Sequence, residues 1–275
     1  MSRFMIKKTR NSGSAVTEKG LAASLGSEGL DVTGITVYAY KSTGSTNALA
    51  MEWGESGGGE ALFVAESQTA GRGRLGRSFL SPEGGLYMSL LLKPESGLAD
   101  FASVTARCAV AVCHALEALT PIRAEIKWVN DIYVDGRKLA GILTQGRVSE
   151  TGKVDFAVIG IGINLVACDL GDEVGSIAIS TEEAVGVIPD KCQLAAKIVK
   201  EIYGVLSGDD TAVLEEYRRR SILTGRSVRV ITAGGEYTAE VLGVDEDYRL
   251  LLDKSGDPVA LATGEVSVRA VDNKE

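Results

Sequence analysis

The residue types best suited to chemistry in this chain lie in a short loop of glycine and arginine, residues 71–77, with the sequence GRGRLGR. Arg72, Arg74 and Arg77 supply guanidinium groups that bind phosphate or carboxylate oxygens, and the glycines let backbone amides approach a ligand closely. The spacing matches neither of the two common phosphate-binding loops. Taken alone, the loop is either a solvated flexible segment or a polyanion site, so its neighbours must decide.

Hydroxyl and amide side chains precede this loop, where we expect a strand to end and a helix to begin. Ser45, Thr46 and Asn47 are residue types that cap helices, which is enough to explain their presence. The same position would also let their polar groups bind a ligand at the helix N-terminus. Gln68 offers a donor and an acceptor directly before the loop. Both interpretations stay open.

A second cluster follows the loop, in the segment KWVND at residues 127–131. Asn130 and Asp131 suit a hairpin turn, but together with Lys127 they could hold a polyphosphate, the carboxylate acting through Mg²⁺. Lys138 opens an otherwise apolar strand. It is either a solvated strand end or a charge directed into a site.

Glycine alternates with isoleucine further along the chain, in the segment IGIGINL at residues 159–165. Gly160 and Gly162 remove side chains from one face of this segment, so a flat ligand could lie against its backbone. The alternative is a bulged core strand that ends in an incidental Asn164.

Composition excludes several classes of site. The chain has one histidine, His114, and four cysteines without a Cys-x-x-Cys pair, which argues against zinc and against a Ser-His-Asp or Cys-His nucleophile. His114, Cys108 and Cys113 fall in an apolar pattern with helical spacing, so we expect them to pack in a core. The net charge of the chain is −8, so the positive charge of the arginine loop is local. It indicates a specific site and does not indicate general affinity for nucleic acid.

Targeting signals are absent from the sequence pattern. The basic N-terminus has no apolar segment after it, and no stretch approaches the length needed to span a bilayer, so we expect a cytoplasmic protein without membrane contact. Residues 1–34 are polar and predict a mobile lead-in with one short helix near residues 21–25. They are too few and too polar for a helix-turn-helix module.

The elements that must position these residues follow from apolar periodicity. Strands are predicted at residues 36–40, 62–65, 86–92, 124–128, 132–134, 139–145 and 155–160, and helices at 47–55, 102–119 and 192–206. This pattern predicts an α+β fold, a mixed sheet with helices on one face. Five short strands at 227–231, 237–244, 249–252, 259–262 and 267–270 predict a small C-terminal barrel. We therefore expect a main domain over 35–223 and a barrel over 224–275.

Taken in order, the motifs at residues 45–47, 65–77, 127–131, 137–143 and 160–165 resemble those of biotin protein ligases, and the resemblance covers residue 35 to the end. It implies a class II synthetase-like catalytic domain and an SH3-like C-terminal domain. Three positions depart from the family's usual pattern: Leu75 stands where a second basic residue is often found, Phe79 where an aromatic residue, often tryptophan, is usual, and Val129 where proline is usual. None of these changes removes a polar contact.

The resemblance also implies roles for individual residues. Biotin would be bound by Ser45, Thr46, Asn47, Gln68, Gly71, Arg72, Lys138, Gly141 and Gly160. ATP would be bound by Arg74, Arg77, Phe79, Asn130, Asp131, Lys138 and Asn164, with Asp131 at the metal. Lys138, Arg74 and Arg72 would be the catalytic residues.

The implied reaction uses ATP, Mg²⁺ and biotin. Biotin would be activated as biotinyl-5′-AMP and transferred to a lysine of a biotin carboxyl carrier protein or domain of a carboxylase. Because the lead-in has no room for a DNA-binding domain, we expect a monofunctional ligase without specific DNA binding, and a homodimer is possible. The alternatives are a lipoate or octanoate ligase and a non-enzymatic biotin-binding module. The barrel has no basic aromatic face, which argues against RNA.

Overall fold

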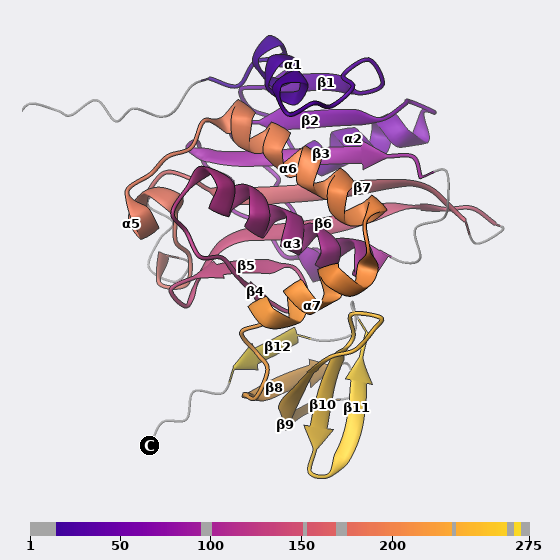
Figure 1. The fold of residues 1–275 in the computed structure, drawn as a ribbon, viewed down its shortest axis with the longest axis vertical. Coiled ribbons are helices and arrows are strands. Elements are labelled where there is room, and N and C mark those ends of the chain that lie inside the picture. The colour runs from indigo at the N-terminus through magenta and orange to yellow at the C-terminus, as the bar shows by residue number, and fades with distance from the viewer. Residues whose placement is uncertain are drawn as a thin grey trace, which may run out of the picture.

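The computed structural model describes residues 15–94, 101–150, 153–168, 175–232, 235–262 and 267–270. It consists of a large α+β part and a small β part at the C-terminal end of the chain (Figure 1). Every strand and helix predicted from the sequence is present within a few residues of its expected bounds.

The large part is built on a seven-stranded mixed sheet with the order β1-β2-β3-β7-β6-β5-β4. Only β1 and β2 pair in parallel, and the other neighbours are antiparallel. Its strands are β1 (Thr36–Tyr40), β2 (Ala61–Ala65), β3 (Gly85–Leu92), β4 (Glu125–Lys127), β5 (Asp131–Val134), β6 (Arg137–Val148) and β7 (Val154–Asn164).

One face of this sheet is covered by α3 (Phe101–Leu119) and α6 (Lys191–Ser207), which cross in front of the strands in Figure 1. Cys108 and Cys113 of α3 are completely buried in this core, as their helical spacing predicts. The same expectation is wrong for His114, whose side chain is 38% exposed and lies beside Glu201. The expectation that no stretch is long enough to span a bilayer is wrong, because α3 has 19 residues and contains an 18-residue window with a mean hydropathy of 1.3. Its burial against α6 and the sheet identifies it as a core helix.

The opposite face carries α2 (Thr46–Glu55), so the prediction that all helices lie on one face is wrong. Ala50 of α2 packs in a second apolar cluster with Phe63, Leu91 and Phe156, whose side chains alternate along their strands with residues of the first core. This second face holds the candidate site.

The N-terminal helix α1 (Glu18–Ser27) lies where the sequence predicts a short helix. Its Leu21 and Leu25 are completely buried in the main core, beside α6. The expected mobile lead-in is therefore wrong for residues 15–34, because two leucines one helical turn apart are enough to anchor a polar segment. Residues 1–14 lie outside the described part of the chain.

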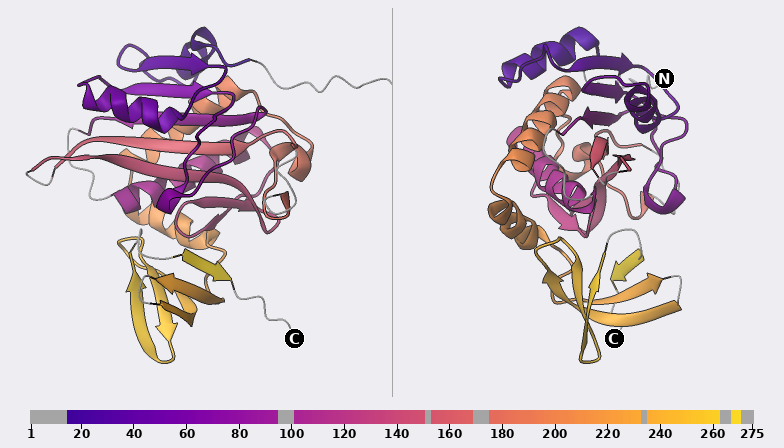
Figure 2. Two further views of the ribbon diagram at one scale, coloured as in Figure 1. Left: turned by 180° about the vertical axis from the view of Figure 1, so that it is seen from behind. Right: turned by 90° about the vertical axis from the view of Figure 1, so that its right-hand side faces the viewer.

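The C-terminal part is a five-stranded antiparallel sheet with the order β11-β10-β9-β8-β12. Its strands are β8 (Ser227–Thr232), β9 (Gly235–Val244), β10 (Leu250–Lys254), β11 (Asp257–Leu261) and β12 (Ser267–Ala270), which confirms the five predicted strands. Among the described residues, two α-helices were not predicted, α5 (Thr181–Val185) and α7 (Asp210–Arg220). Figure 2 shows α7 between the two parts of the molecule.

Candidate functional site

A cavity of about 960 Å³ opens on the α2 face of the large sheet. It is lined by every residue named as a candidate above except Gly71 and Asn164, and by further residues from the segments around them. The described loop is folded as a hairpin: the Phe79 amide donates to Gly71 O at 3.0 Å and the Gly73 amide to Arg77 O at 2.7 Å. A single turn of 3₁₀-helix, η1 (Arg74–Gly76), forms its tip.

Glycines form the floor of the cavity. Gly160 pairs across the sheet with Ser89 and Leu143, and Gly162 pairs with Tyr87 and Gly141. A Cβ atom at Gly160 would lie 1.9 Å from Asn47 Oδ1, and one at Gly162 would lie 2.5 Å from the Phe79 ring. The alternation of glycine with isoleucine therefore lets α2 and the arginine loop approach the backbone of β7.

One end of the cavity, the amide end, is lined by Thr46, Asn47 and Gln68, and Ser89 is buried beneath them. Gln68 Oε1 accepts from the Thr46 amide at 2.8 Å and lies 3.2 Å from the Thr46 hydroxyl. Ser45 caps α2 and accepts from the Ala48 amide at 3.5 Å. The capping and ligand-binding interpretations are thus compatible, because Ser45 caps the helix while it also lines the cavity.

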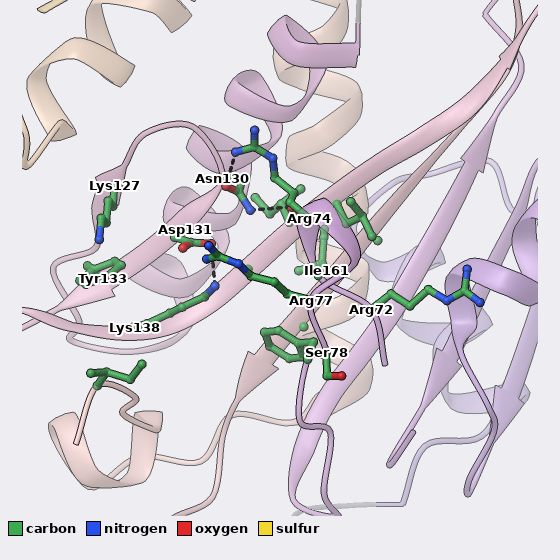
Figure 3. A pocket seen from close by; sticks show the side chains of 18 of the residues that line it. Arg72, Arg74, Arg77, Ser78, Lys127, Asn130, Asp131, Tyr133, Lys138 and Ile161 are labelled. Atoms are coloured by element: carbon green, nitrogen blue, oxygen red, sulfur yellow. Dashed lines mark hydrogen bonds and ion pairs between the residues drawn. The ribbon is translucent and has the colours of Figure 1, made fainter. Parts of the chain in front are cut away.

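The other end, the charged end, is formed by Arg74, Asn130, Asp131 and Lys138 (Figure 3). Arg74 Nη1 donates to Asn130 Oδ1 at 3.1 Å, and Lys138 Nζ lies 2.7 Å from Asp131 Oδ1. Asn130 is itself fixed, because its Nδ2 donates to Ile142 O at 2.9 Å. Arg77 points toward Asp131 in the same view.

The electrostatics of the charged end reflect partial burial. Burial lowers the pKa of Arg74, while the charge of Asp131 opposes that shift. Arg74 Nη2 is buried and, within the described chain, has no hydrogen-bond partner. Burial also raises the pKa of Tyr133 to about 12, with a smaller contribution from Asp131. Arg74 therefore has unused hydrogen-bonding capacity that an anion could satisfy.

Two candidate residues, Gly71 and Asn164, do not line the main cavity, and a third, Arg72, lines it with its guanidinium outside the charged end. Arg72 lines the cavity but is exposed, and its guanidinium points away from the charged end (Figure 3). Gly71 packs within the loop, where a Cβ atom would lie 2.4 Å from Phe79 O. Asn164 faces a separate small cavity and donates to Ile179 O at 3.3 Å. The structure does not bring Asn164 to the main site.

Comparison with known proteins agrees with this geometry. Residues 40–164 match the Biotin/lipoate A/B protein ligase family, and residues 223–269 match the biotin protein ligase C-terminal domain. The biotin–[acetyl-CoA-carboxylase] ligase of Mycobacterium tuberculosis is 31% identical over 241 residues, which cover 82% of this chain and 85% of that protein. The chain belongs to the biotin protein ligase family.

A second relative and a solved structure are also similar to this chain. The bifunctional ligase/repressor BirA of Bacillus spizizenii is 36% identical over 199 residues; the match covers 70% of this chain and 61% of the relative. A biotin protein ligase from Aquifex aeolicus in complex with biotin and ATP superposes with a TM-score of 0.75 at 28% identity, over 86% of this chain and 99% of that one.

The biotin ligase motifs left several site residues undetected. Ser89 on β3 and Gln145 on β6 contact Asn47 beneath the cavity, although neither lies in a motif. An isolated polar residue in the apolar run of β3 was the only signal for Ser89. Trp128, inside the KWVND motif, donates through Nε1 to Tyr248 O of the C-terminal domain at 2.8 Å. A hydrogen bond to the C-terminal domain therefore helps to hold the KWVND motif in place.

A magnesium ion, which the ligase family implies, fits the donor set only in part. The described residues contain no group of three or more His, Cys, Asp or Glu side chains that could hold a metal. Asp131 Oδ1 is buried, and its close contact with Lys138 is an ion pair without the alignment of a hydrogen bond. Since Mg²⁺ often binds through one carboxylate together with substrate phosphates, this oxygen suits an ion that arrives with the nucleotide.

Proposed function

We propose that this protein is a biotin protein ligase that uses ATP to activate biotin as biotinyl-5′-AMP and then transfers the biotinyl group to a carrier lysine. The observation that carries the proposal is one cavity with two unlike ends. The amide end offers uncharged donors and acceptors, which suit a cyclic urea, and the charged end gathers cations around the Asp131 carboxylate.

In the first step, a carboxylate oxygen of biotin attacks the α-phosphorus of ATP, and the bond from that phosphorus to the bridging oxygen breaks to release pyrophosphate. The carboxylate is already ionised at neutral pH, so no general base is needed. Lys138 and Arg74 would orient the reacting groups and neutralise the charge that builds on the phosphoryl oxygens. Lys138 must leave Asp131 to do so.

In the second step, the unprotonated amine of a carrier lysine attacks the acyl carbon of the adenylate. An amide bond forms, the acyl–phosphate bond breaks, and AMP leaves while the amine loses its proton. His114 does not line the cavity; it lies between Glu201 and Glu216, at 3.5 and 3.7 Å, on the opposite face of the sheet.

The same proposal covers five finer points. Asp131 would hold a Mg²⁺ ion that neutralises phosphate charge. The acceptor would be a carrier domain of a biotin-dependent carboxylase. The protein would act in the cytoplasm as a monofunctional ligase without specific DNA binding, and a homodimer is possible. Specific retardation of a biotin-operon promoter in the presence of adenylate would contradict the monofunctional assignment.

Mass spectrometry of a carrier domain tests the function directly. After incubation with this protein, biotin and MgATP, we expect a gain of one biotinyl group on one lysine. Pyrophosphate release is measured in parallel with biotin or lipoate as the only acid. Release with lipoate alone would favour the lipoate ligase, and biotin binding without any release would favour a binding module.

A further inference from the structure

The amide end rests on a buried hydrogen-bond network around Ser89, a residue that lies outside the motifs and has no role assigned to it. Ser89 is completely buried on β3, 2.6 Å from Asn47 Oδ1 and 2.8 Å from the Thr46 hydroxyl. We propose that Ser89 is a specificity-determining positioning residue, which fixes the Thr46 hydroxyl as a hydrogen-bond acceptor and so selects a substrate that presents an N–H there. This inference rests on the proposed biotin ligase function.

The orientation of the Asn47 amide is the first step. Its nitrogen donates to Leu143 O at 3.3 Å and to Gln145 Oε1 at 3.0 Å. A backbone carbonyl can only accept, so the nitrogen must face Leu143 and the oxygen must face Ser89. Asn47 thus has internal partners for both ends of its amide, which favours a supporting role over the direct biotin contact implied by the resemblance.

The position of the hydroxyl protons follows. An amide oxygen can only accept, so the single proton of Ser89 is directed to Asn47 Oδ1 across the shorter contact of 2.6 Å. The contact between Ser89 and Thr46 then needs the proton of Thr46, because two bare oxygens at 2.8 Å would repel each other. The other acceptor for this proton, Gln68 Oε1, lies farther away at 3.2 Å, and either acceptor uses the proton inside the protein. Thr46 has no proton left for a ligand and presents only lone pairs to the cavity.

Gln68 has the opposite polarity. Its Oε1 accepts from the Thr46 amide, so its nitrogen is the other end, which donates to Ser81 Oγ at 3.0 Å. Ser81 in turn donates to Phe79 O at 2.9 Å, which is consistent with this direction. One N–H of Gln68 remains for a ligand.

An acceptor and a donor are therefore set side by side, at Thr46 and Gln68. This pair complements an N–H next to a C=O, as in one half of a cyclic urea. A dithiolane ring has neither group and would leave both unpaired, which is costly in a buried site. The network would thus contribute to the choice of biotin over lipoate.

Two cyclic-carbamate analogues of biotin test the inference, each with one ureido N–H replaced by oxygen. We compare the dissociation constants of biotin and both analogues for the wild type and Ser89→Ala. In the variant, the Thr46 proton keeps only the longer contact of 3.2 Å to Gln68 Oε1 as an internal alternative and can turn toward the ligand. We expect biotin binding to weaken about tenfold and discrimination against one analogue, not both, to fall at least tenfold.

Thr105→Val is the matched control, because Thr105 is also a buried hydroxyl with two partners but lies on α3, across the sheet. We expect Thr105→Val to leave unchanged the ratio of each analogue's dissociation constant to that of biotin. Ser89→Ala with a native melting profile and unchanged ratios would overturn the inference, as would an equal loss of discrimination against both analogues.

Gln145→Met is a milder second variant in case Ser89→Ala does not fold. It removes one of the two acceptors that orient Asn47, so we expect the same analogue to gain about threefold relative to biotin. An unchanged ratio would contradict the inference. Failure of the wild type to bind biotin at all would instead refute the proposed function.

Discussion

The two ends of the cavity differ in how far their polar groups are already committed to one another. At the amide end, Thr46 and Ser89 are buried in a hydrogen-bond network in which Thr46 donates to Ser89 and Ser89 donates to Asn47. At the charged end, Lys138 and Asp131 are each about a quarter exposed and neutralise one another. The amide end is preorganised for a neutral group, whereas the charged end must exchange its internal pair for phosphate and carboxylate oxygens.

Replacing Lys138 should have the largest effect on the reaction. We expect Lys138→Ala to lower the rate of adenylate formation by about a thousandfold, because its charge counts most as negative charge builds on the phosphoryl group. Biotin affinity should change far less, since the amide end is intact. Single-turnover pyrophosphate release and biotin titration separate the two quantities, and equal losses in both would break the distinction between the ends.

Removing the partner of Lys138 should have a smaller effect of the same kind. Asp131→Asn frees the lysine but removes the carboxylate proposed to hold Mg²⁺, so we expect about a thirtyfold slower adenylation and a higher Mg²⁺ requirement. Glu125→Gln is the matched control, because Glu125 is a second carboxylate on the cavity wall. A comparable loss in both variants would mean that total charge, and not position, matters.

The sequence predicted the residues of the charged end better than those of the amide end, and the reason is sequence distance. Arg74, Asn130, Asp131 and Lys138 lie in short, recognisable motifs. Ser89 meets Asn47 across 42 residues, and Gln145 meets it across 98. No local pattern encodes such contacts, because they depend on the register with which β3, β7 and β6 pair.

The fold was predictable to the same degree. Strands and the three amphipathic helices have strong apolar periodicity, whereas α7 buries only Leu214 and Tyr217 among polar residues. Its cap at Asp209 and three terminal arginines were usable signals. The capping box from Ser180 to Glu183 was a similar signal for α5. The placement of α2 on the second face of the sheet could not be predicted. It depends on small residues, glycine and alanine, that let this helix pack closely against the strands.

Loop closure offers a test of intermediate size. Arg74 joins the tip of the arginine loop to Asn130, so we expect Arg74→Gly to increase the rate of adenylate release about tenfold and to raise unspecific lysine labelling. Arg72→Gly should have a smaller effect, because its side chain points away from the charged end. Equal leakage from both variants would show that the loop acts through its total charge.

The ion pairs around Glu216 serve as a comparison for the pair between Lys138 and Asp131 at the charged end, which must separate during the reaction. Glu216 accepts from Arg219 and from Arg220, which also binds Glu117 at 2.6 Å. Burial opposes ionisation of Glu216, but hydrogen bonds from Arg219 and Arg220 outweigh it and lower its pKa to about 2. The carboxylate therefore stabilises the fold above the unfolded-state pKa of 4.5, and this contribution is lost as the pH falls toward 2.

We expect Glu216→Gln to lower the free energy of unfolding by about 1 kcal/mol at pH 7, after allowance for solvent screening, and by progressively less below pH 4.5. Glu215→Gln, at an exposed position beside it, should have no such effect. Asp131→Asn should also cost little stability, because its pair with Lys138 must break in every reaction cycle. Denaturant unfolding from pH 3 to 7 measures all three variants. A larger loss for Asp131→Asn than for Glu216→Gln would mean that the charged end is as firmly fixed as the amide end.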